Sequence, residues 1–299
     1  MKWTIPAKTF LLGEYAALQG EGAIILTTSP VFELSLVSDN EEITGIHPQS
    51  PAGLWWAHHR NLSQGLVWQD PYHDIGGVGA SSAQFLGTYL ASCHVLNMIP
   101  NLHSLMDAYY QSAWQGVGLR PSGYDVLAQT QKGCVYINRQ KNEIKNYNWP
   151  FKDISFILLH SGQKLATHYH LQKTSLPTSI GHLAKTVELA KKAFDKKNSI
   201  GLIDAINQYQ HQLTEMNLMA KHSLSYIKDF KNDTDILAIK GCGALGADVL
   251  LLIVPSVFLD TKLNYLSGLG WTILATNRDL YADKTLMKNN QHKRLEILP

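Results

Sequence analysis

The chain has 299 residues, of which 45% are apolar and 17% are charged. That length suits one large domain or two of ordinary size, and the apolar share is sufficient for a sizeable buried core. The formal net charge is only +2, which argues against a protein that binds nucleic acid or a membrane surface through bulk charge. We therefore expect a globular protein with neither kind of partner.

The cysteines and the two ends of the chain indicate a cytoplasmic location. Cys93, Cys134 and Cys242 are odd in number and far apart, which is typical of a reducing compartment. The first residues lack the charged head and apolar stretch of a signal peptide. The densest apolar run near the C-terminus, Val249 to Val254, has the length of a strand and falls far short of the ~20 residues that span a bilayer.

In the first half, short apolar runs precede a strongly helical stretch. Ala23 to Leu26 and Val31 to Val37 have the composition of strands, whereas the region from Gly45 to Pro71 has no clear pattern. The apolar stripe from Ser81 to Leu96 predicts a helix. A second helix is predicted over Ser104 to Trp114, and a strand over 134–137.

The pattern changes near Pro150, and strands and helices are mixed again in the second half. Predicted strands cover Ile154–Leu159, Asp235–Ile239, Val249–Val254 and Trp271–Ala275, and predicted helices cover Gly181–Lys197 and Ile200–His222. Since strands and helices do not alternate regularly, we predict an α+β protein of two domains, residues 1–150 and 151–299.

A glycine-rich loop gives the strongest local signal for function. Residues 76–83, Gly-Gly-Val-Gly-Ala-Ser-Ser-Ala, lead directly into the helix predicted from Ser81. Small residues let the backbone approach a ligand, and the free N–H groups of a first helical turn attract an anion such as phosphate. The loop lacks the Gly-Lys-Ser/Thr of a Walker motif, the third glycine of a dinucleotide fingerprint and the complete Gly-x-Ser-x-Gly elbow of hydrolases. A purely structural helix cap is the alternative interpretation.

Two further clusters favour a phosphate-containing ligand. A second run of small residues, Gly241 to Ala247, precedes Asp248 and an apolar strand. The segment Pro121-Ser122-Gly123-Tyr124-Asp125 places a carboxylate directly after a tight turn. Two glycine-rich segments and an acid after a turn together indicate phosphate binding with an acid–base residue.

At these residues the chain resembles the GHMP kinases, which include galactokinase, homoserine kinase, mevalonate kinase and phosphomevalonate kinase. The N-terminal stretch from Pro6-Ala7-Lys8 to Gly13-Glu14-Tyr15-Ala16 is similar to the first motif of that family. Residues 77–83 resemble its phosphate loop, and Gly241 to Asp248 resembles its third, glycine-rich motif. The resemblance implies an N-terminal ATP-binding domain like the second domain of ribosomal protein S5 and a ferredoxin-like C-terminal domain.

By the same resemblance, the cofactors are ATP and Mg²⁺, and each motif has an expected role. The ATP phosphates would be bound by the loop residues Gly77, Val78, Gly79, Ala80, Ser81 and Ser82. Ser81 would help to hold Mg²⁺, and Ala80 replaces the first serine of the family loop. Asp125 matches the catalytic aspartate that accepts or orients the acceptor's proton, and Lys8 matches the lysine beside it.

The expected substrate is a small molecule, and phosphomevalonate is the acceptor that the motifs favour. Gln115-Gly116 with Ser122 to Val126, and Asp248 after the third motif, resemble phosphomevalonate kinases. The expected substrate-binding residues, drawn from all the motifs and from a segment of the second half, are Lys8, Glu14, Tyr15, Ser122, Gly123, Lys164, Thr167, Gly243 and Ala244. We expect a monomer or a homodimer.

The chain departs from the family in ways that keep alternatives open. Mevalonate kinases carry a metal-binding Glu upstream of the catalytic aspartate, whereas the nearest upstream acid here is Asp107, with Gln115 in between. Leu245 interrupts the third glycine motif. The alternatives are a mevalonate kinase or another GHMP kinase that phosphorylates a small-molecule hydroxyl, a diphosphomevalonate decarboxylase, and a non-catalytic ligand-binding protein with the same fold.

Overall fold

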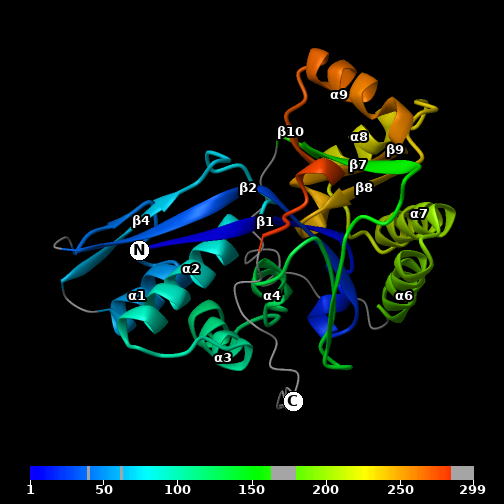
Figure 1. Cartoon of the computed structure of the whole chain (residues 1–299). Helices are drawn as coiled ribbons and strands as arrows, with labels where there is room; N and C mark the ends of the chain where they lie inside the picture. Colours follow the sequence, from blue (N-terminus) through cyan, green and yellow to red (C-terminus); the bar gives the residue numbers. More distant parts are fainter. Residues whose placement is uncertain (39–40, 61–62, 163–179, 284–299) are drawn as a thin grey trace.

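The protein consists of two β-sheets, each covered by helices (Figure 1). The computed structural model describes residues 1–38, 41–60, 63–162 and 180–283. One sheet is built from the first half of the chain and the other from the second half. Among the helices of these ranges, none is both long enough and apolar enough to cross a bilayer.

The first sheet is organised around one long strand. Its strands are β1 (Lys2–Leu12), β2 (Ala23–Ser38), β3 (Ile43–Thr44), β4 (Gln64–Gln69), β5 (Cys134–Asn138) and β6 (Glu143–Tyr147). Strand β1 pairs antiparallel with β2 along nearly its whole length. The other edge of β2 is shared, since β4 pairs with residues 33–38 and β5 with residues 23–26.

Helices cover one side of this sheet (Figure 1). They are α1 (Pro51–His59), α2 (Ala80–Val95), α3 (Leu102–Ala113) and α4 (Tyr124–Gln129), with a short 3₁₀ turn at Ala16–Gln19. Helix α2 packs on β1 and β2 and is itself covered by α1 and α3. A Cβ atom at Gly87 would lie 3.1 Å from Leu34 and 3.3 Å from Ile5, so the missing side chain lets α2 lie close against the sheet.

The second sheet has a fully antiparallel order, β10-β7-β9-β8. Its strands are β7 (Ile154–His160), β8 (Ala238–Cys242), β9 (Val249–Pro255) and β10 (Ile273–Thr276). Its helices are α6 (Gly181–Lys196), α7 (Ser199–Glu215), α8 (Lys221–Phe230) and α9 (Leu259–Gly268), with 3₁₀ turns at Ala244–Gly246, Ser256–Phe258 and Asn277–Asp279. Counted along the chain, the strand order is fourth, first, third, second, which is the ferredoxin-like arrangement that the sequence predicts.

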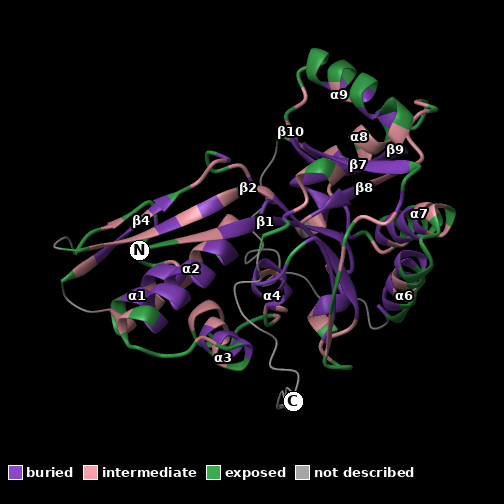
Figure 2. Cartoon of the chain, in the orientation of Figure 1, coloured by how far each residue is buried: buried purple, intermediate pink, exposed green. Residues whose placement is uncertain are grey.

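Helices on both faces explain why the central strands of this sheet are continuously apolar. In β9, Val249, Leu251 and Ile253 belong to the cluster that contains α7 residues such as Leu202. The alternate residues Leu250, Leu252 and Val254 belong to a second cluster with Phe230 of α8 and Leu259 of α9. A strand that is covered on both faces needs no polar alternation, and Figure 2 shows β7 and β9 buried along almost their whole length.

After β10 the chain returns to the first sheet. Leu280 forms an isolated antiparallel bridge with Thr28. The Tyr281 N–H donates to the Thr27 carbonyl at 2.9 Å, and the Tyr281 carbonyl accepts from the Gly133 N–H at 2.9 Å. The two sheets are thus joined by this returning segment as well as by the chain between β6 and β7.

Several predicted boundaries are wrong, each for a local reason. The two strands predicted over residues 23–37 form one strand, β2. The helix predicted to reach His222 ends at Glu215, because Asn217 adopts a left-handed backbone (φ 55°) that a helix cannot contain. The strand predicted from Asp235 begins at Ala238, since the Asp235 N–H donates to the Asp233 side chain in a turn.

Candidate active site

The glycine loop lies at the N-terminus of α2, as the sequence predicts. Gly79 is the residue before the helix and has a φ of 83°, and Gly77 has a φ of 82°. A Cβ atom at Gly79 would lie 2.7 Å from Cγ and 2.8 Å from Cε of Lys8, and one at Gly77 would lie 2.6 Å from Cβ of Asp248. Both positions therefore need glycine for their backbone conformation and for their space, and the loop is packed between the first and third motifs.

The two predicted catalytic residues form an ion pair beside this loop. The Lys8 ammonium lies 2.8 Å from Oδ2 of Asp125, with 11% of the Lys8 side chain and 33% of the Asp125 side chain exposed. Lys8 is held in place by its backbone N–H, which donates to the Val78 carbonyl at 2.9 Å, and its ammonium lies 5.0 Å from the ring centre of Phe10. Asp125 lies in the first turn of α4, where the helix dipole favours a negative charge.

The third glycine motif, which comes from the second sheet, lies next to the glycine loop. A Cβ atom at Gly243 would lie 2.6 Å from Oδ2 of Asp248, and the Asp248 side chain is buried. Gly77 and Gly243 are therefore packed against the same aspartate. Leu245, which interrupts the motif, adopts a left-handed backbone (φ 52°), and its N–H donates to the Tyr15 hydroxyl at 3.2 Å.

The two serines of the loop differ in what their hydroxyls can do. The buried Ser82 donates to the Gly79 carbonyl at 3.0 Å, so its hydroxyl is engaged in the start of the helix. Ser81 is exposed and makes no side-chain hydrogen bond within the described ranges. Ser81 is therefore the serine whose oxygen is available to a ligand or to Mg²⁺, which prefers oxygen ligands.

Glu14, a predicted substrate contact, is engaged in a buried ion pair. Its Oε1 lies 2.6 Å from the ammonium of Lys240, and only 8% of the Glu14 side chain and none of the Lys240 side chain is exposed. The ammonium also donates to the Gly241 carbonyl at 2.9 Å. This pair joins the first motif to the strand that leads into the third motif. The signal for Lys240 in the sequence is a lysine directly before a glycine-rich segment.

Burial keeps the polar groups around this ion pair in defined protonation states. Burial lowers the pKa of Lys240, but the Cys242 sulfur and the Glu14 carboxylate beside it raise the pKa above its ordinary value overall. Burial raises the pKa of the Cys242 thiol to about 11, so the thiol is protonated near neutral pH. Burial also raises the pKa of Tyr15, and the Glu14 charge adds to that shift.

The remaining predicted substrate contacts fall in three groups. The Ser122 hydroxyl accepts from the Tyr124 N–H at 3.3 Å, and Gly123 has a φ of 73°, so both shape the turn before Asp125. Ala244 lies in the short 3₁₀ turn of the third motif. Lys164 and Thr167 lie outside the described residues.

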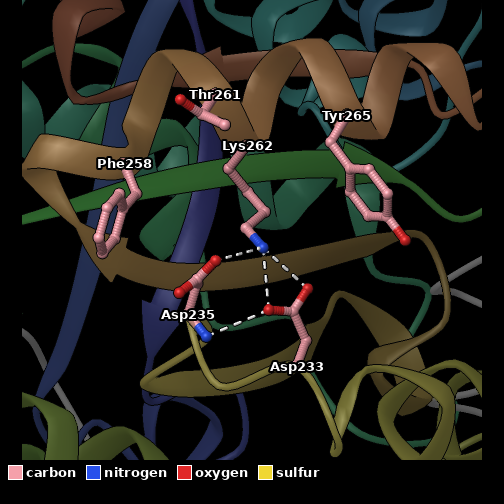
Figure 3. Close-up of a pocket in the computed structure, with 6 residues that line it drawn as sticks. All are labelled: Asp233, Asp235, Phe258, Thr261, Lys262 and Tyr265. Atoms are coloured by element: carbon pink, nitrogen blue, oxygen red, sulfur yellow. Dashed lines mark hydrogen bonds and ion pairs between the residues drawn. The ribbon is translucent and has the colours of Figure 1, made fainter.

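A cavity of about 220 Å³ lies elsewhere, against α9 (Figure 3). The Lys262 ammonium reaches across it to Asp233 at 2.9 Å and to Asp235 at 3.1 Å, between the rings of Phe258 and Tyr265. These charges are paired with one another, and none of the predicted site residues that the structure describes lines the cavity.

Comparison with known proteins gives different results for sequence and structure. No protein-family model and no curated protein matches the sequence. The structure is similar to that of Streptococcus pneumoniae phosphomevalonate kinase in complex with phosphomevalonate and AMPPNP, with a TM-score of 0.76 and 16% identity over 92% of this chain and 99% of that one. Methanococcus jannaschii mevalonate kinase has a TM-score of 0.69 and 15% identity, over 92% and 97% of the two chains. Lactococcus lactis galactokinase complexed with galactose has a TM-score of 0.70 and 9% identity, over 91% and 92%.

The chain therefore has the two-domain α+β fold of the GHMP kinases, and the predicted fold class is confirmed. Its structural neighbours include both mevalonate and phosphomevalonate kinases. The similarity extends over more than nine-tenths of the chain in each of these three comparisons.

Proposed function

We propose that this protein is an ATP-dependent kinase that transfers the γ-phosphate of ATP to a small-molecule acceptor. The observation that carries the proposal is the Lys8–Asp125 ion pair, 2.8 Å long, next to a glycine loop at a helix N-terminus. Phosphoryl transfer depends on positioning and on charge neutralisation, and this arrangement provides both.

The roles of the residues follow from their positions. The backbone N–H groups of residues 77–82 bind the phosphates, because the helix dipole and the unpaired N–H groups of α2 favour anions. The exposed hydroxyl of Ser81 would hold Mg²⁺ together with the phosphates of the nucleotide. When bound, Mg²⁺ neutralises negative charge on the phosphates. Within the described residues no group of three or more His, Cys, Asp or Glu side chains is arranged to hold a metal.

At the acceptor, Asp125 takes the proton of the attacking oxygen, and Lys8 has two effects. Its ammonium pairs with the Asp125 carboxylate at 2.8 Å and so orients it, and it stabilises negative charge that develops on the transferred group. Glu14 acts through its ion pair with Lys240, which fixes the first motif against the third.

We propose phosphomevalonate as the acceptor. The Gln115-Gly116 and Ser122-to-Val126 stretches and Asp248 support this choice, as does the similarity in structure to a phosphomevalonate kinase with phosphomevalonate bound. The test is ADP release from Mg-ATP by the purified protein with phosphomevalonate, mevalonate, homoserine and galactose, each supplied separately. Turnover with phosphomevalonate alone is the expected result. Turnover only with another acceptor would contradict the substrate, and ATP binding without turnover on any of the four would favour a ligand-binding protein.

The substitution Asp125→Asn tests the catalytic role directly. It retains the shape of the side chain but removes its ability to accept a proton, so we expect kcat to fall by about 10²- to 10⁴-fold with little change in the affinity for ATP. Asp107→Asn is the matched control, because Asp107 lies on the exposed side of α3 and pairs with His103. Equal activities of the two variants would contradict the role assigned to Asp125.

A further inference from the structure

We propose that Gln129 is a positioning residue that fixes the glycine loop relative to Lys8 and Asp125; this inference rests on the proposed kinase function. Gln129 lies in α4 one turn after Asp125 and is fully buried. Its Nε2 donates to the Pro6 carbonyl at 2.9 Å and to the Gly79 carbonyl at 3.1 Å. Since both neighbours are acceptors, the nitrogen of the amide must face them.

These two hydrogen bonds connect the three catalytic segments. Pro6 lies in β1 two residues before Lys8, where the register of β1 against β2 shifts between Ile5 and Ala7. Gly79 is the last residue of the glycine loop before α2. The Gln129 side chain, which belongs to the same helix as Asp125, therefore hydrogen-bonds both to the strand that contains Lys8 and to the glycine loop.

The bond to Gly79 has a consequence for the direction of the loop's donors. In a planar trans peptide the carbonyl and the following N–H point in opposite directions. Because the Gly79 carbonyl points toward Gln129, the N–H of Ala80 in the same peptide group points away from Gln129. The same carbonyl accepts from the Ala83 N–H and the Ser82 hydroxyl, each at 3.0 Å, so the start of the helix is fixed as one unit with Gln129.

The oxygen of the Gln129 amide carries a cost that its two donor bonds must offset. The Oε1 of Gln129 is buried and has no hydrogen-bond partner within the described part of the chain, and burying an unpaired acceptor is unfavourable. An apolar side chain would avoid that penalty, but it would remove the donor to the Pro6 and Gly79 carbonyls. A glutamine at this position is consistent with a need for its two donor bonds at the loop.

Nearby Gln131 provides a matched control. It is as deeply buried as Gln129, but its amide contacts Thr130 and Asn146 rather than the loop. We expect Gln129→Leu to weaken ATP binding about tenfold, measured by calorimetry, and to lower kcat about 10²-fold, as expected for misplaced reacting groups. Gln131→Leu should retain the ATP affinity and kcat of the unaltered protein, with a melting temperature near that of Gln129→Leu.

A second variant separates positioning from folding. Gln129→Glu preserves the shape of the side chain but offers a donor only when the introduced carboxyl is protonated, and burial raises the pKa of such a group. Its kcat relative to the unaltered protein should therefore rise as the pH falls, whereas that of Gln131→Glu should not. Two outcomes would overturn the role of Gln129 without affecting the proposed function. One is an equal fall of ATP affinity and kcat in the Gln129 and Gln131 variants, and the other is a kcat of Gln129→Glu, relative to the unaltered protein, that does not change with pH. Failure of the unaltered protein to bind ATP would overturn the proposed function and this inference with it.

Discussion

At the scale of single residues, Lys240 is the clearest case of a charge that the fold requires. Its side chain is fully buried, and its ammonium contacts the Glu14 carboxylate at 2.6 Å. Removal of one member of a buried ion pair leaves the other charge without a partner, which costs about 3–5 kcal/mol. We therefore expect Lys240→Met to lower the free energy of unfolding at pH 7 by that amount, measured by urea denaturation, and the double variant with Glu14→Gln to recover part of the loss.

The control for this prediction is Lys262→Met. Lys262 is also buried, but its partners Asp233 and Asp235 are 22% and 43% exposed, so water solvates them when the ammonium is removed. The loss should be about 1 kcal/mol or less. If Lys240→Met and Lys262→Met lost the same stability, the ion pair with Glu14 would not be the source of the effect.

The sequence predicts which motifs lie together better than it predicts the contacts between them. Lys8, the glycine loop and Asp125 come together as expected, because each belongs to a short motif whose function depends on its own spacing. Gln129 and Lys240 were not predicted, because their roles depend on tertiary contacts with Gly79 and Glu14, far away in the sequence. All the predicted substrate contacts stay predictions, and two of them, Lys164 and Thr167, lie outside the described residues.

At the scale of elements, helix α6 is joined to the hairpin β5–β6 by a network of charges. The Glu188 carboxylate accepts from the Tyr136 hydroxyl at 2.5 Å and pairs with Lys141 at 3.2 Å. Asp195, near the C-terminal end of the same helix, pairs with Lys145 at 2.6 Å. The network connects an element of the second half to the first sheet.

The network should make the protein sensitive to acid. Although burial raises the pKa of Glu188, the Tyr136 and Lys141 donors hold it below its ordinary value overall. A group whose pKa is lower in the folded state stabilises the fold above its unfolded pKa of about 4.3, and this contribution disappears as the pH falls through the folded pKa. We expect Glu188→Gln to lower the free energy of unfolding by about 0.5–1 kcal/mol at pH 7, because the group is partly exposed, and by less at pH 3.

Urea denaturation at the two pH values checks this, with Glu215→Gln as the control. Glu215 is well exposed and, within the part of the chain that the structure describes, pairs only with His211 of its own helix, so its replacement should have little effect at either pH. A Glu188→Gln loss that is equal at pH 7 and pH 3 would indicate lost packing rather than a lost ion pair.

Element types were predicted more reliably than element boundaries. The apolar stripe of α2 and the continuous apolar run of β9 are patterns that depend on local sequence alone. The end of α7 depends on Asn217, and the start of β8 on the turn at Asp233, which are single residues within longer helical or apolar patterns. Helix α1 lies in the region 45–71, for which the sequence predicts no element. It packs against α2 and α3 and has apolar residues around most of its circumference, so its sequence lacks the single apolar stripe that predicts a helix.

At the scale of the whole molecule, one core joins the two halves. A single cluster of buried apolar side chains contains Ile5 and Leu26 of the first sheet together with Phe156 and Leu158 of the second. The returning segment around Tyr281 adds backbone hydrogen bonds to the first sheet. Because the two sheets share buried surface, we expect them to unfold together, as one transition in calorimetry.

Tyr281→Ala tests how far this coupling depends on the returning segment. The Tyr281 side chain is only 4% exposed, and replacement of a buried aromatic residue by alanine costs about 3–5 kcal/mol. We expect the melting temperature to fall accordingly while unfolding stays a single transition, since the shared core is retained. Tyr265→Ala on α9, where the side chain is 54% exposed, should change stability by no more than about 0.5 kcal/mol. Two separate transitions in the unaltered protein would mean that the halves are energetically independent. Two transitions in Tyr281→Ala but one in the unaltered protein would mean that the returning segment, rather than the shared core, couples the halves.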